Sequence, residues 1–235
     1  EYDNDFHVEL SKAVNGKAGD QFSPEGEPPN WRAARQLCET IFERCRDVRL
    51  AIFWARAMVH LEGARSIVDS MRLIAGLLER YWDEVHPMPD DGDAYARVNA
   101  LNDMASGTGL LGDLRGALIV ANRQIGEVRG RDVEIALGTV EARSDDPHYG
   151  KGQIQQIFAA AADADPTLRT FPGAAREQVE RINALMREKV GYSSAPSLQP
   201  MIDLLAAIGS LMPGEMGASG DLLEDAGITD AAGSG

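Results

Sequence analysis

The sequence has 235 residues, a formal net charge of −14, and 44% apolar and 26% charged residues. At ~150 residues per domain, this length makes one large domain or one and a half, and the composition is typical of a globular protein. A negative field repels nucleic acid, and no uncharged apolar run approaches the ~20 residues that cross a bilayer. We therefore expect neither nucleic acid as a partner nor direct membrane insertion.

Apolar residues at helical spacing dominate the N-terminal part of the chain. They predict a short opening helix capped by Asp3 and a second helix that follows Asn30 as its N-cap. The apolar positions are Tyr2, Phe6, Leu10 and Val14 in the first helix, and Trp31, Ala34, Leu37, Cys38, Ile41, Phe42 and Cys45 in the second. Two cysteines seven positions apart on one helix lie ~10 Å apart, which is too far for a disulfide, so we expect free thiols.

Residues 47–62 are apolar at almost every position, which is typical of a helix in the middle of a bundle. A narrow polar strip remains, formed by Arg49, Arg56 and His60. Gly63 is predicted to end this helix, because glycine adopts the left-handed turn after a helix at little cost.

The later segments continue the helical pattern. A stripe over residues 67–85 predicts a third long helix, which Pro87 and Pro89 stop, and an acidic loop containing Asp90 and Asp91 follows. Helical spacing then covers residues 95–104, 110–119, 133–137, 154–161, 175–190 and 198–211. A loop or short strand is expected only within residues 120–128.

This pattern predicts an all-α fold, a helical bundle with a looser second group of helices toward the C-terminus. We expect residues 1–120 to form one helical domain. Residues 121–212 are expected to be a helical extension or a second small domain, and residues 213–235 an acidic tail or linker rich in Gly and Ala. Trp31, Trp54 and Trp82 fall in step with the apolar stripes, so we expect them to pack in the core.

No catalytic, metal-binding or cofactor-binding residues are expected. Gly107, Gly109 and Gly112 match the pattern G-x-G-x-x-G, but that pattern binds a dinucleotide only between a strand and a helix, and helical spacing precedes it here. We therefore expect a loop between helices, with a nucleotide-binding or small-molecule enzyme as the alternative. The histidines are isolated, and no pair has the i, i+4 spacing of two metal ligands on one helix.

Charge is unevenly distributed along the chain. Arginines crowd residues 32–56, and acidic residues crowd residues 83–93. Such segregation indicates either a mixed solvated surface or a patch that docks an oppositely charged partner. If it is a docking patch, the candidate partner-binding residues are Arg49 and Arg56 on one side and Asp90 and Asp91 on the other.

The order of several features along residues 1 to about 120 is characteristic. They are Tyr2-Asp3 with Phe6, Trp31 at the start of a helix, Arg46-Asp47-Val48-Arg49, an apolar helix ending at Gly63, Tyr81-Trp82-Asp83 followed by Pro87, and Arg97 with Leu101. In this order and spacing they resemble the ImpA N-terminal domain, which begins the TssA proteins of bacterial type VI secretion systems.

The resemblance implies a cytoplasmic, non-enzymatic assembly component that coordinates polymerisation of the tail tube and sheath. Its implied partners are protein subunits of the baseplate, tube, sheath or membrane complex, and the full-length protein is implied to form a homo-oligomer. The resemblance implies no cofactor. An acidic helical adaptor unrelated to secretion remains a further alternative.

Overall fold

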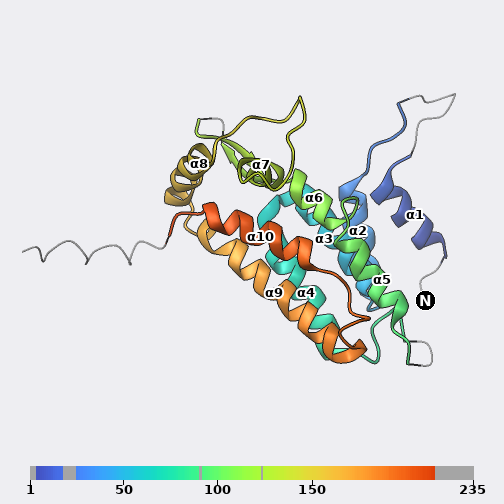
Figure 1. The fold of residues 1–235 in the computed structure, drawn as a ribbon. Helices are drawn as coiled ribbons and strands as arrows, with labels where there is room; N and C mark the ends of the chain where they lie inside the picture. Colours follow the sequence, from blue (N-terminus) through green and yellow to red (C-terminus); the bar gives the residue numbers. More distant parts are fainter. Residues whose placement is uncertain (1–3, 18–24, 90–91, 123, 215–235) are drawn as a thin grey trace, which may run out of the picture.

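The computed structural model describes residues 4–17, 25–89, 92–122 and 124–214, with only the backbone for residues 4–7. This part of the chain is mostly helical, with one β-hairpin (Figure 1). The elements are α1 (Asn4–Asn15), α2 (Trp31–Phe42), α3 (Val48–Glu62), the 3-10 helix η1 (Ala64–Ser66), α4 (Ile67–Arg80), α5 (Tyr95–Met104), α6 (Leu110–Gly116), β1 (Leu118–Asn122), β2 (Gly126–Arg129), α7 (Gly130–Ala136), α8 (Lys151–Ala164), α9 (Thr167–Val190) and α10 (Gln199–Leu211).

The predicted start of α2 and the predicted end of α3 are confirmed, because local signals set them. The Asn30 side chain accepts a hydrogen bond from the Ala33 amide at 3.1 Å and caps α2. Asp47 caps α3 in the same way by accepting from the Arg49 amide at 2.7 Å. Gly63 ends α3 with a φ of +86°, a conformation that favours glycine.

The predicted helix over residues 67–85 is too long, since α4 ends at Arg80. Val85 is buried, as its apolar position suggested, but it lies in the turn that follows. The fully buried guanidinium of Arg97 donates to the Val85 carbonyl at 2.6 Å and also to the carbonyls of Trp82 and Pro87. In a helix that continued through this segment, some of these carbonyls would accept hydrogen bonds from backbone amides of the helix. In the turn they accept from Arg97, whose side chain therefore stabilises the turn.

The predicted helix over residues 110–119 is also too long. α6 ends at Gly116, and Leu118 and Ile119 belong to β1, which pairs antiparallel with β2. The hairpin falls largely in the stretch where a short strand was expected. Ile119, Val120 and Val128 are buried, so pairing the two strands lets β-branched residues join the core.

Both cysteines are free thiols, as expected. They do not share a helix, because α2 ends at Phe42 and Cys45 lies beyond it. Burial raises the pKa of Cys38 to about 12, so this thiol is unreactive at neutral pH.

The buried side chains form two clusters. The smaller lies between α1, α2 and α3, and the larger extends from Val48 in α3 to Leu211 in α10. α9 runs beside α4, to which it is tied by an ion pair between Arg181 and Glu79, and α10 packs on α9 (Figure 1). The mostly helical architecture is confirmed, whereas the bundle arrangement and the division at residue 120 stay predictions. Residues 215–235 of the expected tail lie outside the described residues.

The tryptophans pack against the core, as predicted, but from its margin. Trp31, Trp54 and Trp82 are half-buried, and each contacts a polar side chain. The Trp54 indole N–H donates to Glu39 at 3.3 Å, and the Arg97 guanidinium lies 4.4 Å from the centre of the Trp82 ring. An indole has both an apolar body and a polar edge, which suits this boundary position.

Candidate interaction surface

The polar strip of α3 is organised around a carboxylate from α6. Arg56 Nε lies 2.5 Å from Asp113 Oδ2, and His60 Nε2 lies 2.9 Å from Asp113 Oδ1. The His60 ring stacks on the Trp31 ring with centres 4.0 Å apart. We call Trp31, Arg56, His60 and Asp113 the Asp113 cluster. Because its members come from α2, α3 and α6, the cluster joins three helices.

The charge of Asp113 is stabilised within this cluster. Burial acts to raise the pKa of the carboxyl group, but hydrogen bonds from His60 and Arg56, with the charge of Arg56, outweigh burial and lower the pKa below its ordinary value. The side chains of Asp113 and Arg56 are only 11% and 15% exposed. Arg56 is therefore mainly an internal partner of Asp113.

Arg49 is more accessible. Its side chain is 42% exposed and contacts Asp47, whose carboxylate is fully buried. Asp47 accepts from Arg49 Nε at 3.1 Å and from Nη2 at 2.7 Å, in addition to capping α3. A planar guanidinium held at two points has a fixed direction, so Arg49 presents its charge at a defined place on the surface.

Both arginines line one hollow of about 670 Å³ between α3 and α5. We call it the α3–α5 groove. It is lined by Asn15, Arg49, Ile52, Phe53, Arg56, Ala96, Asn99, Ala100, Asp103, Ser106, Thr108 and Gly109. The structure thus brings together Arg49 and Arg56, two of the candidate partner-binding residues. The other two, Asp90 and Asp91, lie outside the described residues.

The glycines of the G-x-G-x-x-G pattern allow close backbone packing. A helix, α5, precedes them, and no strand feeds this loop in the described part of the chain. A Cβ atom on Gly109 would lie 1.9 Å from the Asp103 carbonyl oxygen, and one on Gly112 would lie 2.0 Å from the Gly107 carbonyl oxygen. Close packing at the start of α6 therefore explains Gly109 and Gly112, whereas a Cβ on Gly107 would meet nothing within 4 Å. The arrangement differs from a dinucleotide site.

Several of the residues that carried the resemblance lie at junctions between elements, while Tyr2 and Asp3 lie outside the described residues. Gly63 joins α3 to η1, and Pro87 lies in the turn after α4, where its carbonyl accepts from the side chain of Arg97 in α5. The Arg46 guanidinium lies 4.2 Å from the centre of the Tyr81 ring. These residues therefore hold places where one helix passes to the next.

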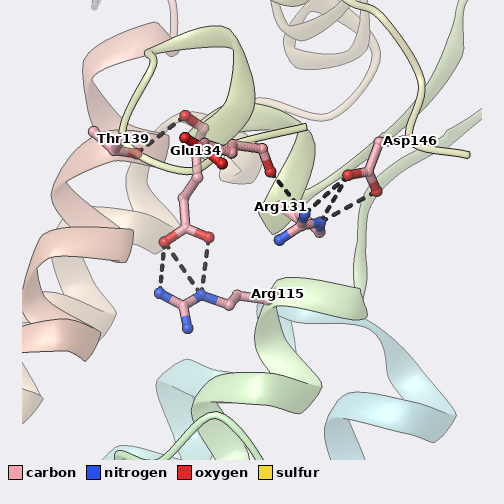
Figure 2. A network of polar contacts seen from close by, with 6 residues as sticks. Arg115, Arg131, Glu134, Thr139 and Asp146 are labelled. Carbon is pink, nitrogen blue, oxygen red and sulfur yellow. Dashed lines mark hydrogen bonds and ion pairs between the residues drawn. The ribbon is translucent and has the colours of Figure 1, made fainter. Parts of the chain in front are cut away.

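A second polar network fixes the position of α7 (Figure 2). Glu134 of α7 accepts from Arg115 of α6 at 2.9 Å, and Arg131 of α7 donates to Asp146 at 2.9 Å. Thr139 donates to the Glu134 carbonyl at 3.0 Å. Each of these residues forms a hydrogen bond with another residue of the network. Because Arg115 lies in α6 and Asp146 in the loop that precedes α8, these bonds hold α7 between the two.

Two of these interactions could not be found from the sequence. Asp113 is 57 positions from Arg56, and Glu134 is 19 positions from Arg115. The 7-and-4 spacing of the polar strip on α3 signals that these side chains share a face, but it does not identify the acid that they meet.

Among the described residues, no cluster of His, Cys, Asp and Glu side chains has the arrangement of a metal site. No helix in the same part of the chain has both the length and the apolar character that a bilayer crossing requires.

Residues 1–106 match the family model described as ImpA, N-terminal, type VI secretion system, so this part of the chain is an ImpA N-terminal region. The match covers α1 to α5 and most of the α3–α5 groove.

The chain is similar to the type VI secretion system component TssA1 of Pseudomonas aeruginosa, with 32% identity over 213 residues. The aligned region is 87% of this chain and 60% of that relative, so the chain spans less than two thirds of the relative's length. A solved structure, the N-terminal domain including the conserved ImpA_N region of the TssA component from Burkholderia cenocepacia, has the same fold. Its TM-score is 0.63 at 19% identity, covering 86% of this chain and 88% of that one.

Proposed function

We propose that the protein is a non-enzymatic assembly component of a type VI secretion system that acts in the cytoplasm by docking to other subunits. The partners proposed are subunits of the baseplate, tube, sheath or membrane complex. The family match and the similarity to TssA1 support the system, and self-association of the full-length protein belongs to the same proposal.

The observation that carries the docking role is the α3–α5 groove. Ile52 and Phe53 give it an apolar wall, while the half-exposed Arg49 supplies a charge in a fixed direction. Apolar contact gives affinity, and a charge at the rim steers encounter and sets register. Asp90 and Asp91 are proposed as a second, acidic contact on sequence grounds alone.

The alternatives have less support. A nucleotide-binding enzyme would use Gly107, Gly109 and Gly112, but a requirement for close backbone packing accounts for two of these glycines. An adaptor unrelated to secretion does not agree with the family match.

The test is site-specific crosslinking in the native cell. A photoreactive amino acid replaces Ala96 or Asn99, which are exposed residues of α5 that line the groove. Illumination during active secretion is followed by mass spectrometry of the captured proteins. We expect subunits of the baseplate, tube, sheath or membrane complex.

Glu177 is the matched control position, because it is exposed on α9 and does not line the groove. Capture of the same proteins from all three positions would show that the groove is not the contact. Capture of proteins unrelated to secretion, and of no secretion subunit, would contradict the proposed function itself.

A further inference from the structure

The β-hairpin has an outer edge, along β1, for which the described part of the chain supplies no hydrogen-bond partner. Asn122 and Gly126 are paired across a loop of only three residues. The residues inside so short a loop cannot bond to each other, so the hydrogen bonds of this pair run directly between the N–H and C=O groups of Asn122 and Gly126. Bonded and non-bonded pairs alternate in an antiparallel ladder, so the next pair, Ala121 and Glu127, is non-bonded. The N–H and C=O of Ala121 therefore point away from β2, and those of Glu127 point away from β1.

The edge of β1 opens into a groove. Two hollows, of about 620 and 240 Å³, share Arg65, Ile119 and Ala121 in their linings. We call the two together the β1 groove. Its walls are β1 itself, the junction of α3 and η1 at Gly63, and the end of α8 at Ala164. Ala121 is exposed, so its outward amide is open to this space.

Unpaired backbone N–H and C=O groups on a strand edge can form hydrogen bonds with an extended chain that lies alongside the strand. The five residues of β1 span ~17 Å, enough to pair with a segment of about the same length. No hydrogen bond from β1 backbone groups to an element other than β2 occurs among the described residues. Gly63 packs beside the Leu118 carbonyl, whereas Ala121 and Asn122 are exposed, so the open part of the edge is the end of β1 at these two residues.

The charges around the β1 groove favour an acidic segment. Its lining carboxylates already have cationic partners: Glu62 pairs with Arg35, Asp113 with Arg56, and Asp165 with Arg65. Arg129 is exposed and also lines the groove. Its neighbouring carboxylate, Asp132, is buried and bonds the Arg129 backbone amide, and within the described ranges the Arg129 guanidinium forms no ion pair. The charge that the groove presents to solvent at this position is therefore positive.

We propose that the edge of β1 binds an extended acidic segment of another protein chain, which adds to the hairpin as a further strand. This inference rests on the proposed function and names a mode of docking for it. Main-chain hydrogen bonds to Ala121 would supply the binding, and a carboxylate beside Arg129 would supply preference for acidic sequences.

The test uses the full chain, labelled for NMR, and a blocked octapeptide of alternating valine and aspartate. We expect the peptide to slow hydrogen exchange of the Ala121 amide. A twin peptide N-methylated at every residue, and a twin with lysine in place of aspartate, should each bind at least about tenfold more weakly. These two twins leave the protein unchanged, so they test the edge without any risk of misfolding.

Ala121→Pro provides the matched protein variant. Proline is tolerated on an edge strand where the N–H faces outward, so the fold should be kept while peptide binding falls at least about tenfold. Glu127→Pro makes the same change on the opposite edge of the hairpin and should leave binding unchanged. Thermal unfolding of both variants checks that they fold equally well.

The remaining outcomes overturn the proposal. Undiminished binding by Ala121→Pro, or by the N-methylated peptide, would exclude strand addition at this edge, and so would the absence of any exchange protection at saturating peptide. Protection of Ala121 in the free chain would mean another occupant: a second copy if it grows with protein concentration, or the chain's own C-terminal segment if it does not. None of these results bears on crosslinking from the α3–α5 groove, which tests the proposed function separately.

Discussion

Arg97 is a fully buried cation whose partners are backbone carbonyls. Its guanidinium binds the carbonyls of Trp82, Val85 and Pro87 and lies over the Trp82 ring. Burial lowers the pKa of Arg97, but an arginine stays charged in this range, so its hydrogen bonds are charge-assisted. The side chain therefore holds the turn that connects α4 to α5.

Arg97→Ala should destabilise the protein strongly, because three carbonyls lose their donor and a cavity forms. We expect a loss of about 3–5 kcal/mol, lowering the melting temperature by roughly 10 °C in calorimetry. Arg97→Lys keeps the charge but not the planar set of donors, so its stability should lie between that of the wild type and that of Arg97→Ala. Arg72→Ala is the matched control, since Arg72 is 59% exposed, and a loss equal to that of Arg97→Ala would contradict this role.

Asp113 should make stability depend on pH. Its folded-state pKa is lowered, so its ionised form stabilises the fold above the ordinary carboxyl pKa of ~3.9, and that contribution is lost as pH falls through the folded pKa. Asp113→Asn removes this contribution. The difference in unfolding free energy between wild type and variant, measured by denaturant titration, should therefore be largest near pH 7 and shrink toward pH 3.

The charged or titratable groups in direct contact with Asp113 are Arg56 and His60. Asp69→Asn serves as the control, because Asp69 is 79% exposed and its ion pair with Arg72 lies on the surface. A difference for Asp113→Asn that stays constant from pH 7 to pH 3 would show that the carboxylate is not stabilised by these two neighbours.

Among the helices, the packing of α6 against the loop that follows α5 depends on glycine. Inside a helix, alanine normally makes the folded state about 1 kcal/mol more stable than glycine does. Gly112→Ala should nevertheless destabilise by about 2–3 kcal/mol, because its Cβ would meet the Gly107 carbonyl. Chemical unfolding of the purified variant measures this.

Gly76 and Gly107 supply the comparisons, since a Cβ at either position meets nothing within 4 Å. Gly76→Ala, inside α4, should be neutral or stabilising by up to about 1 kcal/mol, and Gly107→Ala should change little. If Gly112→Ala were as stable as Gly107→Ala, the close approach would not be what requires glycine.

Sequence periodicity predicted those helix ends that depend on nearby residues. Asn30 and Gly63 act within one turn of the chain, so their effect is visible in the sequence. The ends at Arg80 and Gly116 were missed, because the turn after α4 depends on Arg97 and the strand after α6 depends on pairing with β2. Such contacts between distant residues override local propensity.

For the candidate surface, the sequence indicates the residues on one helix but not the groove that they line. Arg49 and Arg56 were identified from the arginine-rich stretch, and their spacing placed them on one side of α3. The groove that they share also needs α5, and the acid that holds Arg56 comes from α6. Neither follows from periodicity, because both require knowing which helices pack side by side.

At the scale of the whole molecule, the described residues offer grooves on a mostly helical surface. The α3–α5 groove and the β1 groove both border the Asp113 cluster, since Arg56 lines the first and His60 and Asp113 line the second. Two docking sites beside one cluster would let the protein hold two partners next to each other. We expect variants that fill one groove to leave the other site's binding unchanged, which titration with the octapeptide measures.

On the proposed function, the protein serves type VI secretion through the α3–α5 groove. The most direct measurement is release of the tube subunit into the medium by cells whose chromosomal gene carries Ala96→Trp and Asn99→Trp. With normal protein level and melting temperature, we predict release as low as in cells lacking the gene, and wild-type release with the control Glu177→Trp. Undiminished release from the groove-filled variant would contradict the account.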